Sequence, residues 1–304
     1  MKLPDKTYAA IDIGSNAVRL LIKRVDTDAP SPENALRKEL LVRVPLRLGF
    51  DVFSRGKVSS KKAGNLIRLM KAYRQLIKIY NADELRACAT SAMRDAANGQ
   101  ELIRKIDSET GIKIEIIAGE EEAAIVYNNH LECTGDLHGN YLYVDVGGGS
   151  TELNFLTGGE LKASGSFNIG TVRILSDKVK ASEWERLNTF LDTLKASCAT
   201  GINIIGSGGN INKLYKMASE KDAEAKTFPV SELSRLYHQM EPLSVEQRIT
   251  RFNLKPDRAD VIIPASEIFL HIAAVIGASY IMVPVIGVAD GIIDGMFARD
   301  LRAD

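Results

Sequence analysis

The sequence predicts an α/β protein whose two domains share one order of strands and helices. The chain has 304 residues, enough for two domains that each bury a hydrophobic core. In both halves, the hydrophobic pattern predicts three strands followed by helices that alternate with strands. A short apolar strand that ends in Asp-x-Gly and leads into a tight turn occurs once in each half. Together these observations favour the internal duplication of one α/β unit.

The composition excludes several classes of protein. Hydrophobic residues make up 45% of the chain and charged residues 26%, the balance of a soluble globular protein. Lys and Arg together number 39, as do Asp and Glu, so the formal net charge is zero. This argues against a basic coat for nucleic acid. The three cysteines, Cys88, Cys133 and Cys198, form no Cys-x-x-Cys motif, so we expect free thiols in a reducing compartment.

One apolar segment, from Ile272 to Ala289, resembles a membrane span in composition. Gly277, Pro284 and Gly287 interrupt it, so a buried helix followed by a short strand explains it better. The first residues also lack the apolar stretch of a secretion signal. We therefore expect a cytoplasmic protein without a membrane or nucleic-acid partner.

The first half of the chain predicts the element order βββαβαβ. Strands are expected where apolar runs are short or alternate with polar residues, and helices where apolar residues recur every three to four positions. Gly111 is expected to end the second helix. In chain order, the expected elements are strands at Tyr8–Ile13, Val18–Lys23 and Leu40–Leu46, a helix at Lys61–Tyr80, a strand at Leu85–Ala89, a helix at Glu101–Glu109 and a strand at Ile112–Ile116.

The second half repeats this order and adds helices. Ser182-Glu183-Trp184-Glu185 predicts a capping box that opens a helix toward Cys198. The other expected elements are strands at Tyr141–Val146, Glu152–Leu156, Glu160–Phe167 and Ile202–Ile205, a helix from about Asn210, helices at Val230–Met240, Val245–Arg251 and Asp257–Ala278, a strand at Tyr280–Val283 and a helix at Asp290–Arg302.

The two Asp-x-Gly turns are the strongest functional signal. Ile11–Asn16 aligns with Val144–Gly149, with Asp12 matching Asp145. Glycine turns expose backbone N–H groups that bind phosphate oxygens, and an aspartate at the preceding strand end can hold Mg²⁺. Two such hairpins facing each other would hold one phosphate chain from both sides. An ordinary hairpin turn also explains the first copy taken alone, whereas the consecutive glycines of the second favour a function.

Three further segments have both a functional and a structural interpretation. Arg19 and Arg94 could neutralise phosphate, although each also fits a solvated surface position. The acidic run Glu120–Glu122 either stabilises a helix N-terminus or supplies a general base to a water molecule. The turn Gly206–Asn210 either binds a phosphate or nucleoside at a helix N-terminus or packs closely between strand and helix.

With these motifs in view, the chain resembles the exopolyphosphatase/guanosine pentaphosphate phosphatase (Ppx/GppA) family. The resemblance spans nearly the whole chain and keeps the order of the motifs. It rests on Asp12–Leu20, Ala89–Ala96, Ile117–Ala123, Asp145–Leu153, Gly170–Arg173, Gly206–Gly209 and Arg258–Asp260.

The resemblance implies two ribonuclease-H-like domains, of the actin, Hsp70 and sugar-kinase group, flanking a cleft. We expect residues 1–118 with 290–304 to form the first domain and residues 119–289 the second. It also implies Mg²⁺-dependent removal of the terminal phosphate from polyphosphate, from pppGpp, or from both. The general base then falls on Glu122, with Glu121 as the fallback. The implied metal ligands are Asp12, Asp145 and Glu152. The implied phosphate-binding residues are Gly14, Ser15, Asn16, Arg19, Arg94, Gly147, Gly148, Gly149, Ser150, Thr151, Gly208 and Gly209.

Several departures from the family pattern leave the substrate open. Ala17 stands where serine is usual, Asn210 replaces a usual threonine, and Ala289 stands where a basic residue is common. Inorganic polyphosphate is the first expectation and pppGpp the alternative. A sugar- or acetate-kinase-like phosphotransferase and a non-catalytic, actin-like nucleotide sensor are more distant alternatives. Whether the protein forms a homodimer also stays open.

Overall fold

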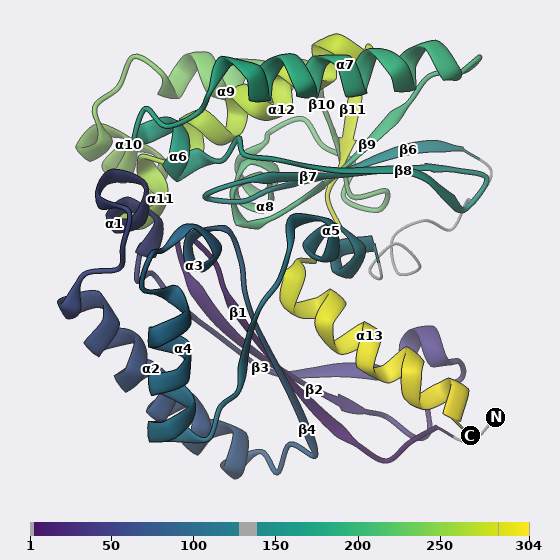
Figure 1. Ribbon diagram of the computed structural model, residues 1–304. Helices are drawn as coiled ribbons and strands as arrows, with labels where there is room; N and C mark the ends of the chain where they lie inside the picture. The colour runs from purple at the N-terminus through teal and green to yellow at the C-terminus, as the bar shows by residue number, and fades with distance from the viewer. Residues whose placement is uncertain (1–2, 128–138, 285, 304) are drawn as a thin grey trace. The chain divides into compact units, whose positions relative to one another are not determined.

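The structure is a computed structural model that describes residues 3–127, 139–284 and 286–303 (Figure 1). The chain divides into unit 1, residues 1–133 with 288–304, and unit 2, residues 134–287. The boundaries expected from the sequence lay after residues 118 and 289. Helix α5 (Gly119–Tyr127) instead belongs to unit 1, because it packs against helix α13 (Val288–Ala303) of that unit.

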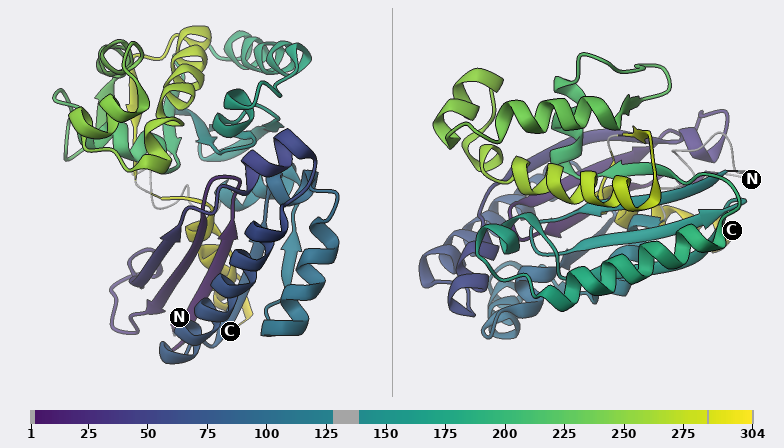
Figure 2. Two further views of the ribbon diagram at one scale, coloured as in Figure 1. Left: turned by 90° about the vertical axis from the view of Figure 1, so that its left-hand side faces the viewer. Right: turned by 90° about the horizontal axis from the view of Figure 1, so that it is seen from above.

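Unit 1 is a five-stranded sheet with helices on both faces. The sheet order is β3-β2-β1-β4-β5, in which β1, β2 and β3 are antiparallel neighbours and β4 and β5 continue parallel to β1. Helices α2 and α4 cover one face and α13 the other, so β1 is buried on both sides (Figures 1 and 2). The elements are β1 (Thr7–Ile13), β2 (Val18–Val25), η1 (Pro32–Asn34), β3 (Leu36–Val44), α1 (Leu48–Arg55), α2 (Ser60–Ile79), β4 (Glu84–Ala89), α3 (Ser91–Asp95), α4 (Gly99–Thr110) and β5 (Ile114–Ile116).

Unit 2 is a six-stranded sheet in the order β10-β11-β9-β6-β7-β8. Helices α7, α9 and α12 lie on one side of it (Figure 1), and α12 packs its apolar residues into the core. The elements are β6 (Asn140–Val146), β7 (Thr151–Thr157), β8 (Glu160–Phe167), α6 (Thr171–Leu175), α7 (Ala181–Ser197), β9 (Asn203–Ser207), α8 (Gly209–Met217), β10 (Thr227–Pro229), α9 (Val230–Met240), α10 (Val245–Phe252), α11 (Pro256–Ala259), α12 (Ile262–Ile276) and β11 (Tyr280–Met282).

The two sheets confirm the expected duplication. Without the edge strand β10, the second sheet runs β8-β7-β6-β9-β11, which matches β3-β2-β1-β4-β5 strand for strand. The directions also agree, since the first three strands of each unit are antiparallel and the next two are parallel to the first. The prediction of an α/β fold with two ribonuclease-H-like domains is therefore confirmed.

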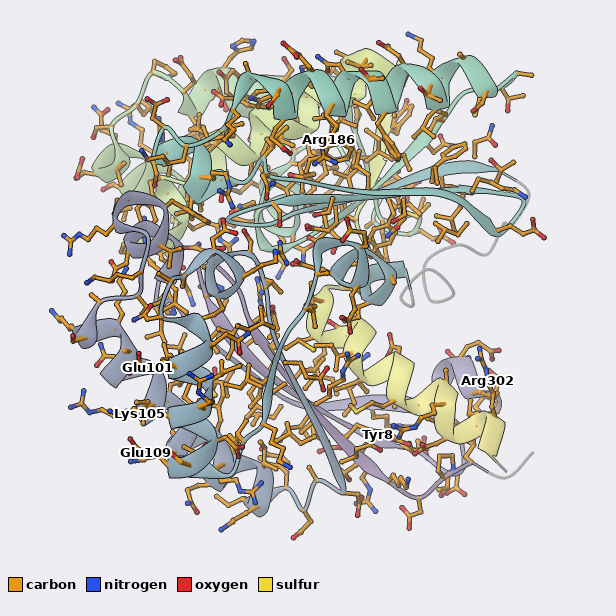
Figure 3. The ribbon with its side chains drawn as sticks, in the orientation of Figure 1. Tyr8, Glu101, Lys105, Glu109, Arg186 and Arg302 are labelled. Carbon is orange, nitrogen blue, oxygen red and sulfur yellow. The ribbon has the colours of Figure 1, made fainter. Side chains whose placement is uncertain are left out.

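In α4, buried apolar residues and exposed charged residues lie on opposite faces of the helix, which orients it on the sheet. Leu102 and Ile106 are buried, whereas Glu101, Lys105 and Glu109 follow one another at four-residue spacing on the solvent side (Figure 3). Such i, i+4 pairs of opposite charge stabilise an exposed helical face. Gly111 ends this helix in the left-handed region, as the sequence predicts.

Two sequence predictions of helices in unit 2 are wrong. Helix α7 begins at Ala181 without a side-chain cap, so the expected capping box at Ser182 does not form. A capping box instead joins Ser244 and Gln247 at the start of α10. The single helix expected from Asp257 to Ala278 is two helices, α11 and α12. Ser244 can cap because it is itself the extended N-cap residue of α10 (φ −65°, ψ 163°), whereas Ser182 lies inside α7, one residue past its start.

The apolar segment around α12 is largely a core element. By length and composition, Pro256–Ile276 could cross a membrane, but 67% of its most apolar stretch is buried inside the protein. It ends at Gly277, whose φ of 76° lies in the left-handed region, and strand β11 follows. This agrees with the expected buried helix followed by a short strand.

A buried carboxylate ties α9 to the end of α8 and predicts an acid-sensitive contribution to stability. Glu232, 2% exposed, accepts hydrogen bonds from Arg235 and from the backbone N–H and hydroxyl of Ser219. The Arg235 guanidinium, with Ser219, lowers the pKa of Glu232 to about 2. A lowered folded-state pKa stabilises the protein above the ordinary pKa near 4.5, and this contribution is lost as the pH falls toward 2.

We expect Glu232→Gln to lower the free energy of unfolding by about 1–3 kcal/mol at pH 7. The difference from wild type should shrink as the pH falls below 4.5. Urea denaturation followed by circular dichroism at several pH values measures both effects. Glu224→Gln, at an exposed position of the same unit, is the control and should change little. A difference that stays constant with pH would contradict the assigned role of the ionised carboxylate.

Candidate functional site

The first glycine turn joins β1 to β2 and is closed by one backbone bond. The Gly14 N–H donates to the Ala17 carbonyl at 3.1 Å. The carbonyls of Ser15 and Asn16 accept hydrogen bonds from the N–H groups of Gly49 (2.8 Å) and Arg47 (2.9 Å). Since C=O and N–H of one trans peptide point in opposite directions, the amides that follow these carbonyls are turned away from residues 47–49.

The second turn, between β6 and β7, repeats this geometry. The Gly147 N–H donates to the Ser150 carbonyl at 2.9 Å, which matches the bond in the first turn. The Gly147 carbonyl accepts from Thr171, and the Gly148 carbonyl from Val172 at 2.8 Å and Arg173 at 3.1 Å. The amides of the following residues therefore point away from this supporting segment.

Arg173 and Gly170 fix the second turn further. The Arg173 Nε donates to the Gly149 carbonyl at 2.7 Å, and its side chain is buried. A Cβ atom at position 170 would lie 2.4 Å from the Gly149 carbonyl carbon and 2.5 Å from the Ser150 nitrogen, so only glycine fits. Thr151 bonds the Ile169 carbonyl through its hydroxyl at 2.6 Å, which leaves this expected phosphate ligand engaged within the scaffold.

Each supporting segment begins three positions after the end of the third strand of its unit. Arg47–Gly49 follows β3, and Gly170–Arg173 follows β8. Sequence reasoning quoted the second segment only as a family motif and gave neither segment a role. A glycine a few residues after the third strand of each unit, Gly49 or Gly170, was the signal that could have identified them.

The two hairpins share a backbone but differ in charge. Asp12 lies opposite Arg19 in the β1–β2 register, and Asp145 lies opposite Glu152 in the β6–β7 register. Arg19 forms an ion pair with Asp12 at 2.5 Å. Asp145 and Glu152 are 6% and 1% exposed, and residues directly opposite on antiparallel strands lie side by side. Unit 2 therefore carries an acidic pair where unit 1 carries an ion pair.

The expected metal ligands fall in different units. Among residues 3–127, 139–284 and 286–303, no group of three or more His, Cys, Asp or Glu is gathered closely enough to hold a metal ion. Asp12 is bonded to Arg19, and Ser166 donates to Glu152 at 3.0 Å. The pair Asp145 and Glu152 still fits Mg²⁺, which takes one or two carboxylates and completes its shell with water and phosphate oxygens.

The third turn lies beside Asp145. Ser207 is opposite Asp145 in the β6–β9 register, and Gly208 has φ of 100°, where a Cβ would lie 2.9 Å from Asp145 Oδ1. Arg258 packs on Gly209 and donates to Asn210 Oδ1 at 2.8 Å. Unit 2 therefore places Asp145 next to Glu152 in one strand register and beside the third glycine turn.

The structure separates the two candidate bases. Glu122 is 6% exposed, and its Oε2 lies 3.6 Å from Nη1 of Arg94, which also donates to the Ile117 carbonyl at 2.7 Å. Glu121 is an exposed side chain that pairs with Arg86 at 2.7 Å. Glu122 therefore faces an arginine in the protein interior, whereas Glu121 belongs to a surface ion pair.

Of the two described thiols, Cys88 is the one beside Asp12 of the first hairpin, and its environment makes it unreactive. It lies opposite Asp12 in the β1–β4 register and is fully buried. Burial raises the pKa of its thiol to about 12, so the thiolate is scarcely populated at neutral pH. Cys88 and Cys198 are both free, while Cys133 lies outside the described residues.

Residues 41–300 match the model of the Ppx/GppA phosphatase family. This chain belongs to the Ppx/GppA phosphatase family. It is 28% identical to a "Bifunctional 3-dehydroquinate synthase/phosphatase" of Fusobacterium nucleatum, and the match covers 90% of this chain and 44% of that protein. Exopolyphosphatase 2 of Mycobacterium tuberculosis is 28% identical, over 84% of this chain and 86% of its own length. A guanosine-5'-triphosphate,3'-diphosphate pyrophosphatase of Vibrio cholerae is 33% identical over 57% of this chain and 33% of its own.

Solved structures of the Ppx/GppA family share this fold. The family member from Aquifex aeolicus has a TM-score of 0.76 at 25% identity, covering 98% of this chain and 99% of its own. An exopolyphosphatase from Cytophaga hutchinsonii has a TM-score of 0.83 at 20% identity, covering 97% and 98%, and shows the fold alone. The family membership and the duplicated sheets thus agree.

Proposed function

We propose that this chain is an exopolyphosphatase, which hydrolyses the terminal phosphoanhydride of inorganic polyphosphate and releases orthophosphate. The observation that carries the proposal is the repeated hairpin. In each copy, the loop carbonyls accept hydrogen bonds from the supporting segment, so the loop amides point away from that segment. Each hairpin has an aspartate at its root, Asp12 or Asp145. Phosphoryl transfer depends mainly on such positioning and charge stabilisation.

The relatives support polyphosphate as the first substrate to test and pppGpp as the second. The Mycobacterium tuberculosis relative, named an exopolyphosphatase, is covered over 86% of its length, whereas the Vibrio cholerae relative is covered over 33% of its own. Both substrates end in a phosphoanhydride, so the same donors and base serve either one.

In the proposed reaction, the loop amides and Arg94 bind the oxygens of the terminal phosphate. Glu122 accepts a proton from a water molecule, whose oxygen forms a bond to the terminal phosphorus while the anhydride P–O bond opposite to it breaks. The products are orthophosphate and a chain shortened by one phosphate. Asp145 and Glu152, with Asp12, are the residues proposed to hold Mg²⁺. When bound, Mg²⁺ supplies positive charge against neighbouring phosphates.

Phosphate release from polyphosphate, pppGpp and ATP, each with and without Mg²⁺, tests the proposal. We expect Mg²⁺-dependent release from polyphosphate, slower release from pppGpp and little from ATP. ADP formation that depends on an acceptor hydroxyl would instead indicate a kinase. Tight binding without phosphate release would indicate a nucleotide sensor. The proposed enzyme is cytoplasmic and needs no membrane or nucleic-acid partner.

A further inference from the structure

We infer that Gly291 of α13 is a positioning residue for Glu122, because it sets how closely helix α5 packs in unit 1. The inference rests on the proposed function, in which Glu122 is the general base. From the sequence, the helix that contains Gly291 was expected to belong to the first domain, but no functional role was expected for it.

The contact between α5 and α13 leaves no room for a side chain at position 291. A Cβ atom on Gly291 would lie 2.1 Å from the carbonyl oxygen of Ile125 and 2.9 Å from its carbonyl carbon. Both are backbone atoms of α5, so no side-chain rotation relieves the overlap. Figure 1 shows α5 beside the beginning of α13, as this distance requires. Any larger residue must therefore push the two helices apart.

Helix α13 is itself held firmly on the sheet. Lys23 of β2 is 4% exposed, and its Nζ lies 3.2 Å from Asp290 and 3.1 Å from Asp294 of α13. At the other end of the helix, Tyr8 of β1 donates to Asp300 at 2.7 Å, and Figure 3 shows Tyr8 beneath α13. Since these contacts tie α13 to both β1 and β2, we expect α5 to shift when the contact is overfilled.

Displacement of Ile125 reaches Glu122 because the two residues are one turn apart on α5. A helical turn moves nearly as a rigid body, so a shift at the Ile125 carbonyl changes the distance between Glu122 and Arg94, now 3.6 Å. The Arg86–Glu121 ion pair holds the same turn from the surface side. The position of Glu122 is thus set by successive contacts from β2 to α13 and from α13 to α5.

Gly291→Ala is expected to lower kcat by about 10–100-fold and to leave KM within about threefold, because misplacement by about 1 Å reduces catalysis more than binding. Helix propensity alone would make alanine more favourable than glycine by about 1 kcal/mol. A loss of activity in this variant would therefore come from the steric overlap and not from a weaker helix. Gly64→Ala in α2 is the matched control. Its Cβ would meet only the Arg68 guanidinium at 3.8 Å, and its activity should equal that of wild type.

A readout without substrate separates this inference from the proposed function. Hydrogen–deuterium exchange of peptides covering residues 119–127 should rise in Gly291→Ala and stay unchanged in Gly64→Ala. If Gly291→Ala does not fold, Asp294→Asn loosens α13 without adding atoms, and it should raise the same exchange and lower kcat by a smaller factor.

The activity and exchange measurements together distinguish the two claims. A wild-type protein that releases no phosphate from any substrate ends the proposed function, and the exchange comparison then decides whether Gly291 positions α5. Unchanged exchange at residues 119–127 overturns the inference. So does an active wild type whose folded Gly291→Ala variant keeps kcat within twofold or changes KM alone.

Discussion

Replacing Glu122 with Gln is expected to lower kcat by about 10²–10⁴-fold while the affinity for polyphosphate changes by less than about threefold. Glutamine keeps the shape and can still contact Arg94, but it cannot accept the proton of the attacking water. Glu122 is buried, with Oε2 3.6 Å from Arg94, so the arginine contact is the feature that the glutamine must preserve. Steady-state phosphate release and calorimetric binding of tripolyphosphate measure the two quantities separately.

The neighbouring glutamates provide a graded comparison. Glu121→Gln removes a surface ion pair with Arg86 and should lower kcat by less than tenfold. Glu120→Gln, at an exposed position, should be indistinguishable from wild type. If Glu121→Gln loses more activity than Glu122→Gln, the base is assigned to the wrong residue of the run.

Gly170→Ala is expected to lower kcat/KM by about 10²–10³-fold, with a rise in KM. The added methyl group would lie 2.4–2.5 Å from backbone atoms of Gly149 and Ser150. The loop must move away from Gly170–Arg173, and the carbonyl bonds that orient its amides are then strained or lost. Because these amides are the proposed phosphate donors, substrate binding and turnover should fall together. The same assays as for Glu122 measure this.

Gly201→Ala is the matched control in unit 2, since no atom lies within 4 Å of its Cβ position. It should retain wild-type kinetics and the wild-type urea midpoint. A folded Gly170→Ala variant that binds tripolyphosphate as tightly as wild type would show that the second glycine turn is not a phosphate site.

The sequence predicted the features that are local along the chain. The strands around both glycine turns were found because a strand, a turn and a second strand leave their signature within a few residues. The alignment of Asp12 with Asp145, together with the repeated order of strands and helices, predicted the duplication that the two sheets confirm. The roles given to the residues of these turns stay predictions, to be tested by the variants above.

Features that depend on contacts between distant segments were not predicted. The support of the glycine turns by Arg47–Gly49 and Gly170–Arg173 arises only when the third strand of each unit returns to its first hairpin. Likewise, only the family resemblance ranked Glu122 ahead of Glu121, because the acidic run itself does not show which glutamate is buried. Arg86 and Arg94, on other elements, make Glu121 a surface partner and Glu122 an interior group.

The late position of α13 in the chain has a consequence for biosynthesis. Residues 134–287 are contiguous, so unit 2 has all of its elements as soon as they leave the ribosome. Unit 1 waits for residues 288–303, and until then one face of β1 and β2 lacks its cover. The nascent chain therefore carries an exposed apolar sheet throughout the translation of unit 2, a period in which chaperones and aggregation compete for it.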